Sequence, residues 1–188
     1  MIPMRMVAVL VLLAGMAGAA RADDISESIE LARKSYQSGD LAGAKQSLDL
    51  ASQLIGQKNA EGFAALLPNP LPGWKADKAQ STALGAVMFG ASVASRSYSN
   101  SNGDNVEVQI TGDSAMVMQF ATLLSNPQIA GAMGKLIRVG SQRAIQTAEG
   151  DVNMVISNKF LVTVQGSGSG GDKIAYAQAV DIIKLTKM

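Results

Sequence analysis

Three stretches of the sequence alternate apolar and polar residues, and this alternation constrains the fold more than any other feature. It covers residues 106–110, 152–156 and 160–164, in which every second residue is Val, Ile, Met or Phe. A period of two is typical of β-strands that bury one face against a core. Turn-forming residues lie on either side of the second stretch, at Gly150 and at Asn158. We therefore expect strands that pair through tight turns in an antiparallel sheet.

Other patterns add further elements to this sheet. Shorter strands are predicted over residues 74–79, 137–139 and 143–147. Apolar residues at helical spacing predict one helix over residues 114–126 and a second from about residue 172 to the C-terminal residues. The glycine-interrupted sequence ALGAVMFGASVA, residues 83–94, is compatible with a strand or a helix. Residues 74–188 are thus expected to form an antiparallel α+β domain with helices packed on its sheet.

A proline-rich segment separates this domain from a helical one. The sequence LLPNPLPGW places Pro68, Pro70 and Pro72 where neither a helix interior nor a central strand can continue, so residues 68–73 are predicted to be an extended connector. Trp74 follows as the expected apolar anchor at the entrance to the sheet domain. Residues 23–67 are predicted to form two amphipathic helices that break at Gly39 and fold back as a hairpin.

This hairpin resembles a single tetratricopeptide repeat. The residues that fall at the usual offsets of the repeat are Leu31-Ala32, Gly39-Asp40, Ala44, Leu48 and Ala51. The resemblance implies a surface that binds a peptide segment of another protein. Close packing of small residues between two helices explains the same pattern, and only one copy of the repeat is present.

The first residues have the composition of an export signal. Arg5 precedes an apolar run over residues 6–20, and Ala20-Arg21-Ala22 is a small-x-small cleavage site. We expect residues 1–22 to be removed as a signal peptide and the mature protein to be periplasmic or secreted. No later segment is long and apolar enough to span a membrane, so no membrane span is expected after cleavage.

The residue types that are missing exclude several function classes. The sequence has no His and no Cys, which excludes the usual Ser-His-Asp and Cys-His hydrolases and zinc sites built on imidazole. The predicted signal peptide contributes two of the 16 basic residues and none of the 15 acidic ones, so the mature chain is nearly neutral and no nucleic-acid partner is expected. The acidic residues near predicted loops or strand ends, Asp104, Glu107, Asp113 and Asp151, form no pair that the sequence places across a cleft. We expect no enzymatic activity and no cofactor.

Two motifs suggest ligand sites, and both have simpler interpretations. Asn100, Asn102 and Asp104 fall at the first three ligand positions of a calcium loop, but Asn105 and Thr111 stand where Gly and an acid are needed. A hairpin turn explains these residues better. The sequence GSGSGG, residues 166–171, matches a dinucleotide-binding glycine pattern, but the chain lacks the strand and the acid that should follow. A flexible connector is the preferred interpretation.

Short phrases in the sheet domain carry a second family resemblance. They are PLPGW at residues 70–74, SRSY at residues 95–98 and VEVQITGDSAM at residues 106–116. With the predicted signal peptide and the helix that follows, residues 71–187 resemble a group of bacterial secreted proteins with a PsbP/Mog1-like α/β domain. The resemblance implies a binding or assembly accessory and carries over no active-site residues.

The combined hypothesis is a non-enzymatic accessory that contacts another periplasmic protein through the hairpin, residues 83–94 or the open face of the sheet. The alternative is a carrier of a small apolar ligand. Its predicted binding surface consists of Met88, Phe89, Met116 and Phe120. The methionines also suggest a third function, copper binding, which the M-x-M spacing of Met116 and Met118 on a helix does not favour.

Overall fold

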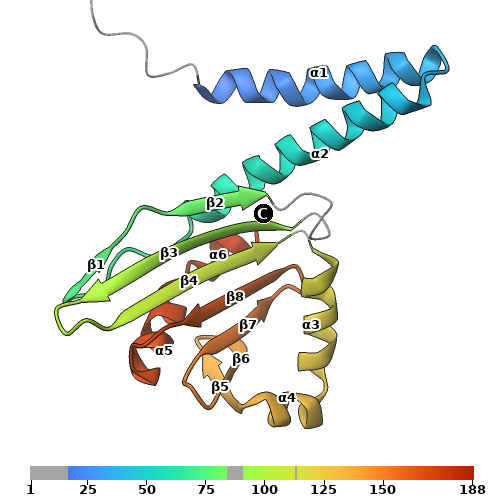
Figure 1. The fold of residues 1–188 in the computed structure, drawn as a ribbon. Coiled ribbons are helices and arrows are strands. Elements are labelled where there is room, and N and C mark those ends of the chain that lie inside the picture. The colour runs from blue at the N-terminus through green and yellow to red at the C-terminus, as the bar shows by residue number, and fades with distance from the viewer. Residues whose placement is uncertain (1–16, 84–90, 113) are drawn as a thin grey trace, which may run out of the picture. The chain divides into compact units, whose positions relative to one another are not determined.

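The computed structural model describes residues 17–83, 91–112 and 114–188 (Figure 1). The chain divides into two compact units between Leu54 and Ile55. This division falls inside a helix, whereas the sequence placed the change at the proline-rich connector of residues 68–73. The last turns of that helix therefore belong to the same unit as the sheet.

The first unit is a pair of helices, α1 (Ala17–Gln37) and the greater part of α2 (Leu41–Ala64). The predicted break between them is confirmed, because Gly39 has a positive φ of 82° that an L-residue rarely adopts. Asp40 then caps α2, since its Oδ1 accepts a hydrogen bond of 2.9 Å from the backbone N–H of Gly43. From residue 24 onward, the side chains buried in this unit are small: Ser28, Ala32, Ala44, Ser47 and Ala51.

The second unit contains an eight-stranded antiparallel sheet, which confirms the predicted α+β class. Its strands are β1 (Trp74–Ala76), β2 (Gln80–Ala83), β3 (Ser92–Asn100), β4 (Asn105–Gly112), β5 (Lys135–Val139), β6 (Gln142–Gln146), β7 (Val152–Ile156) and β8 (Phe160–Gln165). The strand order is β1-β3-β4-β8-β7-β6-β5, and β2 also pairs with β3. The strand expected over residues 74–79 is shorter in the structure, and β2 was not predicted because its QSTA sequence has no buried face.

Four helices accompany this sheet among the described residues. The helix predicted over residues 114–126 is confirmed, a further helix that was not predicted follows it, and the predicted C-terminal helix is divided in two. The helices are α3 (Ala115–Ser125), α4 (Pro127–Met133), α5 (Gly170–Ala179) and α6 (Ile182–Leu185). Asn126 and Pro127 end α3 as predicted but also start α4, because the Asn126 side chain accepts from the backbone of Gln128 and proline suits a first helical turn. The C-terminal helix is interrupted because Val180 is extended, with ψ of 130°, and Asp181 caps a new helix.

One face of the sheet forms the core of this unit. The alternating residues of the three predicted stretches are fully buried there, together with Tyr176, Ala177 and Leu185 from α5 and α6. Both helices lie over that face in Figure 1. Phe63, near the end of α2, joins the same core with its ring edge-on to Phe160 at a centroid distance of 5.5 Å.

The proline-rich segment is fastened to this core by aromatic side chains. The Tyr98 hydroxyl donates a 2.7 Å hydrogen bond to the carbonyl oxygen of Pro68, and the backbone N–H of Leu71 donates to the Tyr176 hydroxyl at 3.3 Å. The two tyrosine rings are 4.3 Å apart between centroids, and Trp74 packs edge-on against Tyr176 at 5.5 Å. Trp74 is therefore the packing anchor that the sequence predicted.

Replacing Tyr98 by Phe should weaken this attachment. The buried hydroxyl is lost while the ring remains, so we expect the free energy of unfolding to fall by about 1 kcal/mol. Urea unfolding followed by the fluorescence of Trp74, the only tryptophan, reports on this unit. Tyr36→Phe is the control, because Tyr36 is 68% exposed and its substitution should leave the urea midpoint unchanged.

The same variant should also change the response to alkaline pH. Burial raises the pKa of Tyr98 from 10.0 to about 12, so between these pH values the unfolded chain loses this proton before the folded chain does. The stability that Tyr98 contributes is fully present below pH 10 and is lost as pH rises toward 12. The wild-type protein should therefore lose more stability over this interval than Tyr98→Phe, and parallel losses would contradict the assignment.

Candidate functional site

The sheet face opposite the core changes from apolar at one edge to polar at the other. Cross-strand pairing aligns one row of side chains along it, which runs from Leu136 through Ile145, Asn153, Thr163 and Gln109 to Ser95. The β5 and β6 end of this row is apolar, and the middle and far end are polar. Thr163 donates to the Asn153 side chain at 3.1 Å, so the polar part forms its own hydrogen bonds.

A pocket of about 580 Å³ lies at the apolar end of this face, where α3 and α4 meet the strands. Its apolar lining residues are Ala121, Leu124, Ala130, Leu136, Ile137, Ala144, Ile145 and Val155. Its polar lining residues are Arg138, Ser141, Gln142, Arg143, Ser157 and Asn158. In Figure 1, α3 and α4 stand beside this end of the sheet.

Small residues allow the helices to approach the strands closely. Ala121 and Ala130, one from each helix, are buried, and Ile145 on the strand side is only 2% exposed. Gly134 ends α4 with φ of 156°, and a Cβ at this position would collide with the carbonyl oxygen of Gln146 in β6. The turn from α4 into β5 therefore requires glycine.

Two arginines face each other across the β5–β6 pair at the pocket. Arg138 and Arg143 occupy directly opposite positions in the antiparallel register, and both are exposed. Neither guanidinium group makes a hydrogen bond or an ion pair with any part of the chain that the structure describes. The described residues that line the pocket include no carboxylate. The pocket thus combines apolar walls with an uncompensated positive charge.

Of the four side chains predicted to form an apolar surface, the structure describes only Phe120, and it does not line this pocket. Met88 and Phe89 lie outside the described residues, and Met116 is in α3 with a side chain that is also outside them. Phe120 is half-buried on α3 and is not among the lining residues, whereas the next residue along the helix, Ala121, is. Arg138 and Arg143 were not predicted as site residues, although Arg138 lies between two apolar residues of one short predicted strand and Arg143 begins another.

The candidate calcium loop is a hairpin turn, as predicted. The Asn100 side-chain oxygen accepts from the backbone N–H groups of Asn102 and Asp104 at 2.9 and 3.0 Å, and its amide donates to the Asp104 carboxylate at 2.9 Å. Gly103 has φ of 85°, as such a turn requires. Within the described ranges, no group of three or more His, Cys, Asp or Glu side chains could hold a metal ion.

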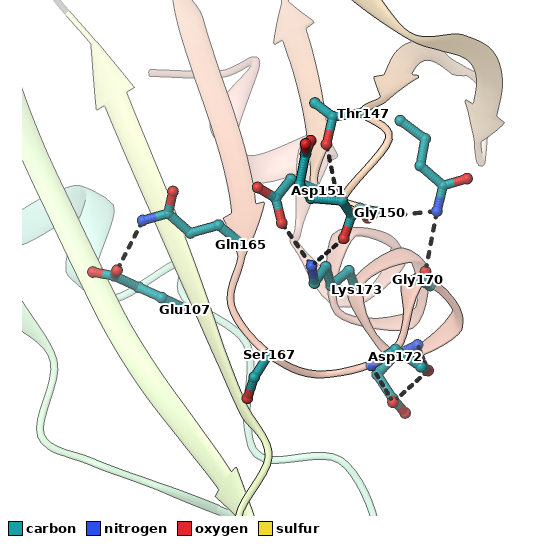
Figure 2. A network of polar contacts seen from close by, with 12 residues as sticks. Glu107, Thr147, Gly150, Asp151, Gln165, Ser167, Gly170, Asp172 and Lys173 are labelled. Atoms are coloured by element: carbon teal, nitrogen blue, oxygen red, sulfur yellow. Dashed lines mark hydrogen bonds and ion pairs between the residues drawn. The ribbon is translucent and has the colours of Figure 1, made fainter.

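The glycine-rich segment before α5 is held by hydrogen bonds, so its description as a flexible connector is wrong. Ser167 forms two hydrogen bonds with the Asn105 side chain, and the Gly168 backbone N–H donates to the Asn105 carbonyl at 2.8 Å. Ser169 and Asp172 form a reciprocal capping box at the start of α5 (Figure 2). The helix N-terminus therefore already has a carboxylate of its own.

Lys173 is a buried charged residue that the sequence analysis missed. It is 1% exposed, and its Nζ donates to Asp151 Oδ1 at 2.6 Å and to the Glu149 carbonyl at 2.8 Å (Figure 2). The two partners lie in the turn between β6 and β7, while Lys173 lies in α5. The ion pair therefore ties α5 to this turn, and its role is structural.

Comparison of the chain with protein-family models, with curated proteins and with solved structures found no match. The likeness to PsbP/Mog1-like and tetratricopeptide proteins thus remains a prediction. Among the described residues, no helix combines the length and the hydropathy needed to cross a bilayer.

The Lys173 ion pair should respond unequally to removal of its two partners. Asp151→Asn leaves a buried ammonium without its counter-charge and should lower the free energy of unfolding by about 2–3 kcal/mol. Lys173→Met replaces the buried cation by an apolar chain and leaves a carboxylate that is already 28% exposed, so it should cost about 1 kcal/mol. Urea unfolding of both variants measures the difference.

Lys184→Met is the matched control, because it removes a lysine whose ion pair with Asp181 is 71% exposed on the lysine side. This variant should change stability by less than about 0.5 kcal/mol. A larger loss for Lys173→Met than for Asp151→Asn would contradict the structural role assigned to the pair.

Proposed function

We propose that the protein is an exported, non-enzymatic binding protein that holds a small, largely apolar molecule in the pocket between α3, α4 and the β5–β7 strands. The observation that carries this proposal is the pocket itself, whose 580 Å³ lies within the range of about 300–1,000 Å³ typical of small-molecule sites. Eight apolar residues from two helices and three strands line it. Export remains part of the proposal through the predicted signal peptide, residues 1–22.

The chemistry of the pocket supports binding better than catalysis. General acid–base catalysis needs a side chain that exchanges a proton near neutral pH, and the polar residues described in the lining are Arg, Ser, Gln and Asn. Ser141 and Ser157 would need a neighbouring base to act as nucleophiles, and the chain contains no His. These residues can donate hydrogen bonds and orient a ligand.

Filling the pocket should abolish binding of an apolar probe. The neutral dye N-phenyl-1-naphthylamine fluoresces strongly in apolar surroundings, and we expect a saturable increase with the wild-type protein. Val155→Trp places a large ring on a half-buried lining position and should weaken the dye affinity by about tenfold or more, because overpacking excludes the ligand. Fluorescence titration measures both affinities.

The control for this variant is Ser97→Trp, which adds the same ring at an exposed position of β3 outside the pocket. It should bind the dye as the wild-type protein does. Equal binding by Val155→Trp and Ser97→Trp would show that the dye does not enter this pocket, and absence of saturable binding to the wild type would remove the proposal.

The helical pair favours a second function, contact with a protein partner. It leaves six large apolar side chains 48–68% exposed, namely Ile29, Leu31, Tyr36, Leu41, Leu48 and Leu50. Residues of both helices also line a groove of about 540 Å³, with Leu31 and Leu50 as its large apolar members. An apolar groove between helices suits the apolar face of an amphipathic helix. We propose such a helix, from another periplasmic protein, as its occupant.

Site-specific photocrosslinking tests this occupant. A benzoylphenylalanine at Leu50 in the full-length protein, irradiated in the cell that produces it, should give one discrete adduct with another protein. Adding Leu31→Asp should remove the adduct, because a charge in the groove opposes an apolar face, whereas Tyr36→Ser outside the groove should leave it. An adduct of twice the chain mass would assign the groove to a second copy and contradict the proposal.

A further inference from the structure

We infer that the ligand of the sheet pocket is an anionic amphiphile, whose oxyanion head group is held between Arg138 and Arg143 and whose apolar tail lies toward α3 and α4. This inference rests on the proposed function of the same pocket and adds the chemical class of the ligand. It follows from the register of β5 and β6, from the charges at the pocket and from the burial of its walls.

The register of β5 and β6 brings the two arginines next to each other on one face of the sheet. Arg138 and Arg143 are direct partners in an antiparallel pair, and such partners have Cβ atoms about 4.5–5.5 Å apart on the same side of the sheet. Leu136 and Ile145, the next residues on that side, are also direct partners. A pair of arginines is therefore followed along the same two strands by a pair of apolar side chains.

The positive charges of Arg138 and Arg143 repel each other and destabilise the ligand-free protein. Like charges directly opposite each other in a sheet are destabilising, and no described carboxylate offsets these two. An oxyanion between them would reverse the sign of the interaction. Guanidinium groups suit this purpose because their planar N–H donors match a carboxylate or phosphate in two parallel hydrogen bonds.

The exposure of the lining residues gives the ligand an orientation. Both arginines are exposed, and the half-buried side chains of Leu124, Ile137 and Val155 offer accessible apolar surface in the pocket. The charged head group thus stays near water, where its desolvation is small, while the tail covers apolar surface. Ser157 and Asn158, both at positive φ in the β7–β8 turn, add neutral hydrogen-bonding groups to the rim.

Matched amphiphiles that differ only in the head group test this assignment. Decanoate, decyl phosphate and 1-decanol would each be titrated against the dye complex of the full-length protein at low salt. We expect at least one of the two anions to displace the dye at a concentration about tenfold or more below that of decanol, as charged hydrogen bonds imply. The two anions together show whether the head group is a carboxylate or a phosphate.

Arg138→Gln with Arg143→Gln should remove this preference, because it should weaken binding of the two anions far more than binding of decanol. The control is Lys75→Gln with Lys78→Gln, which removes the same charge from β1 and the loop after it, at the sheet edge opposite β5. This control should keep the preference for anions. Arg143→Lys, which keeps the charge but not the planar fork, should give an intermediate affinity and serves if the double variant does not fold.

The outcomes separate this inference from the proposed function. If decanol binds as tightly as the anions, or if the double arginine variant keeps the preference, the inference fails while the pocket remains a binding site. If neither the dye nor any amphiphile binds the wild type, the proposed function fails as well. A second readout is the stability of the ligand-free protein. Arg143→Gln removes one of the two repelling charges, so it should raise the urea midpoint at low salt but not at high salt. A lowered midpoint would overturn the inference.

Discussion

The pairing of β4 with β8 is the constraint on which the rest of the sheet unit depends. Its register sets Val108 opposite Val164 and Ile110 opposite Val162, so four buried side chains share one face. A slip of one residue would expose these side chains and bury Gln109 and Thr163 in their place. The same register therefore fixes both the core under α5 and α6 and the opposite face on which the pocket lies.

Much of this architecture is determined by residues that are close together in the sequence, and for this reason the sequence predicted it. Alternation over five residues reports a strand and its buried face without knowledge of the partner strand. The turn at Asn100–Asp104 also depends on a few adjacent residues, because one asparagine side chain and one glycine backbone define it. Local sequence can also be ambiguous: Asn126 and Pro127 predict the end of α3, but the same two residues also suit the start of α4, where they cap the helix and form its first turn.

The pocket and the buried lysine could not be predicted in the same way, because both depend on which distant segments meet. Arg138 and Arg143 become a pair only through the register of β5 and β6, and the pocket forms only where α3 and α4 return to that edge. Lys173 looks like an exposed helical lysine until α5 packs beside the turn that contains Asp151. The proline-rich segment is similar, since its attachment depends on Tyr98 and Tyr176 from far along the chain.

The two units differ in how much the binding of a ligand or partner would change their order and stability. The pocket is built on strands whose core face contains large buried side chains, so its walls are ordered before a ligand arrives and binding loses little conformational entropy. Among the residues of the helical pair whose burial is described, the buried ones are alanines and serines, whose transfer from water contributes little stability, while Leu31, Leu41, Leu48 and Leu50 are exposed. Binding of a partner helix would bury those leucines and stabilise the pair itself. The proposed ligand site and the proposed protein-binding surface are therefore compatible within one chain, because each belongs to a different unit.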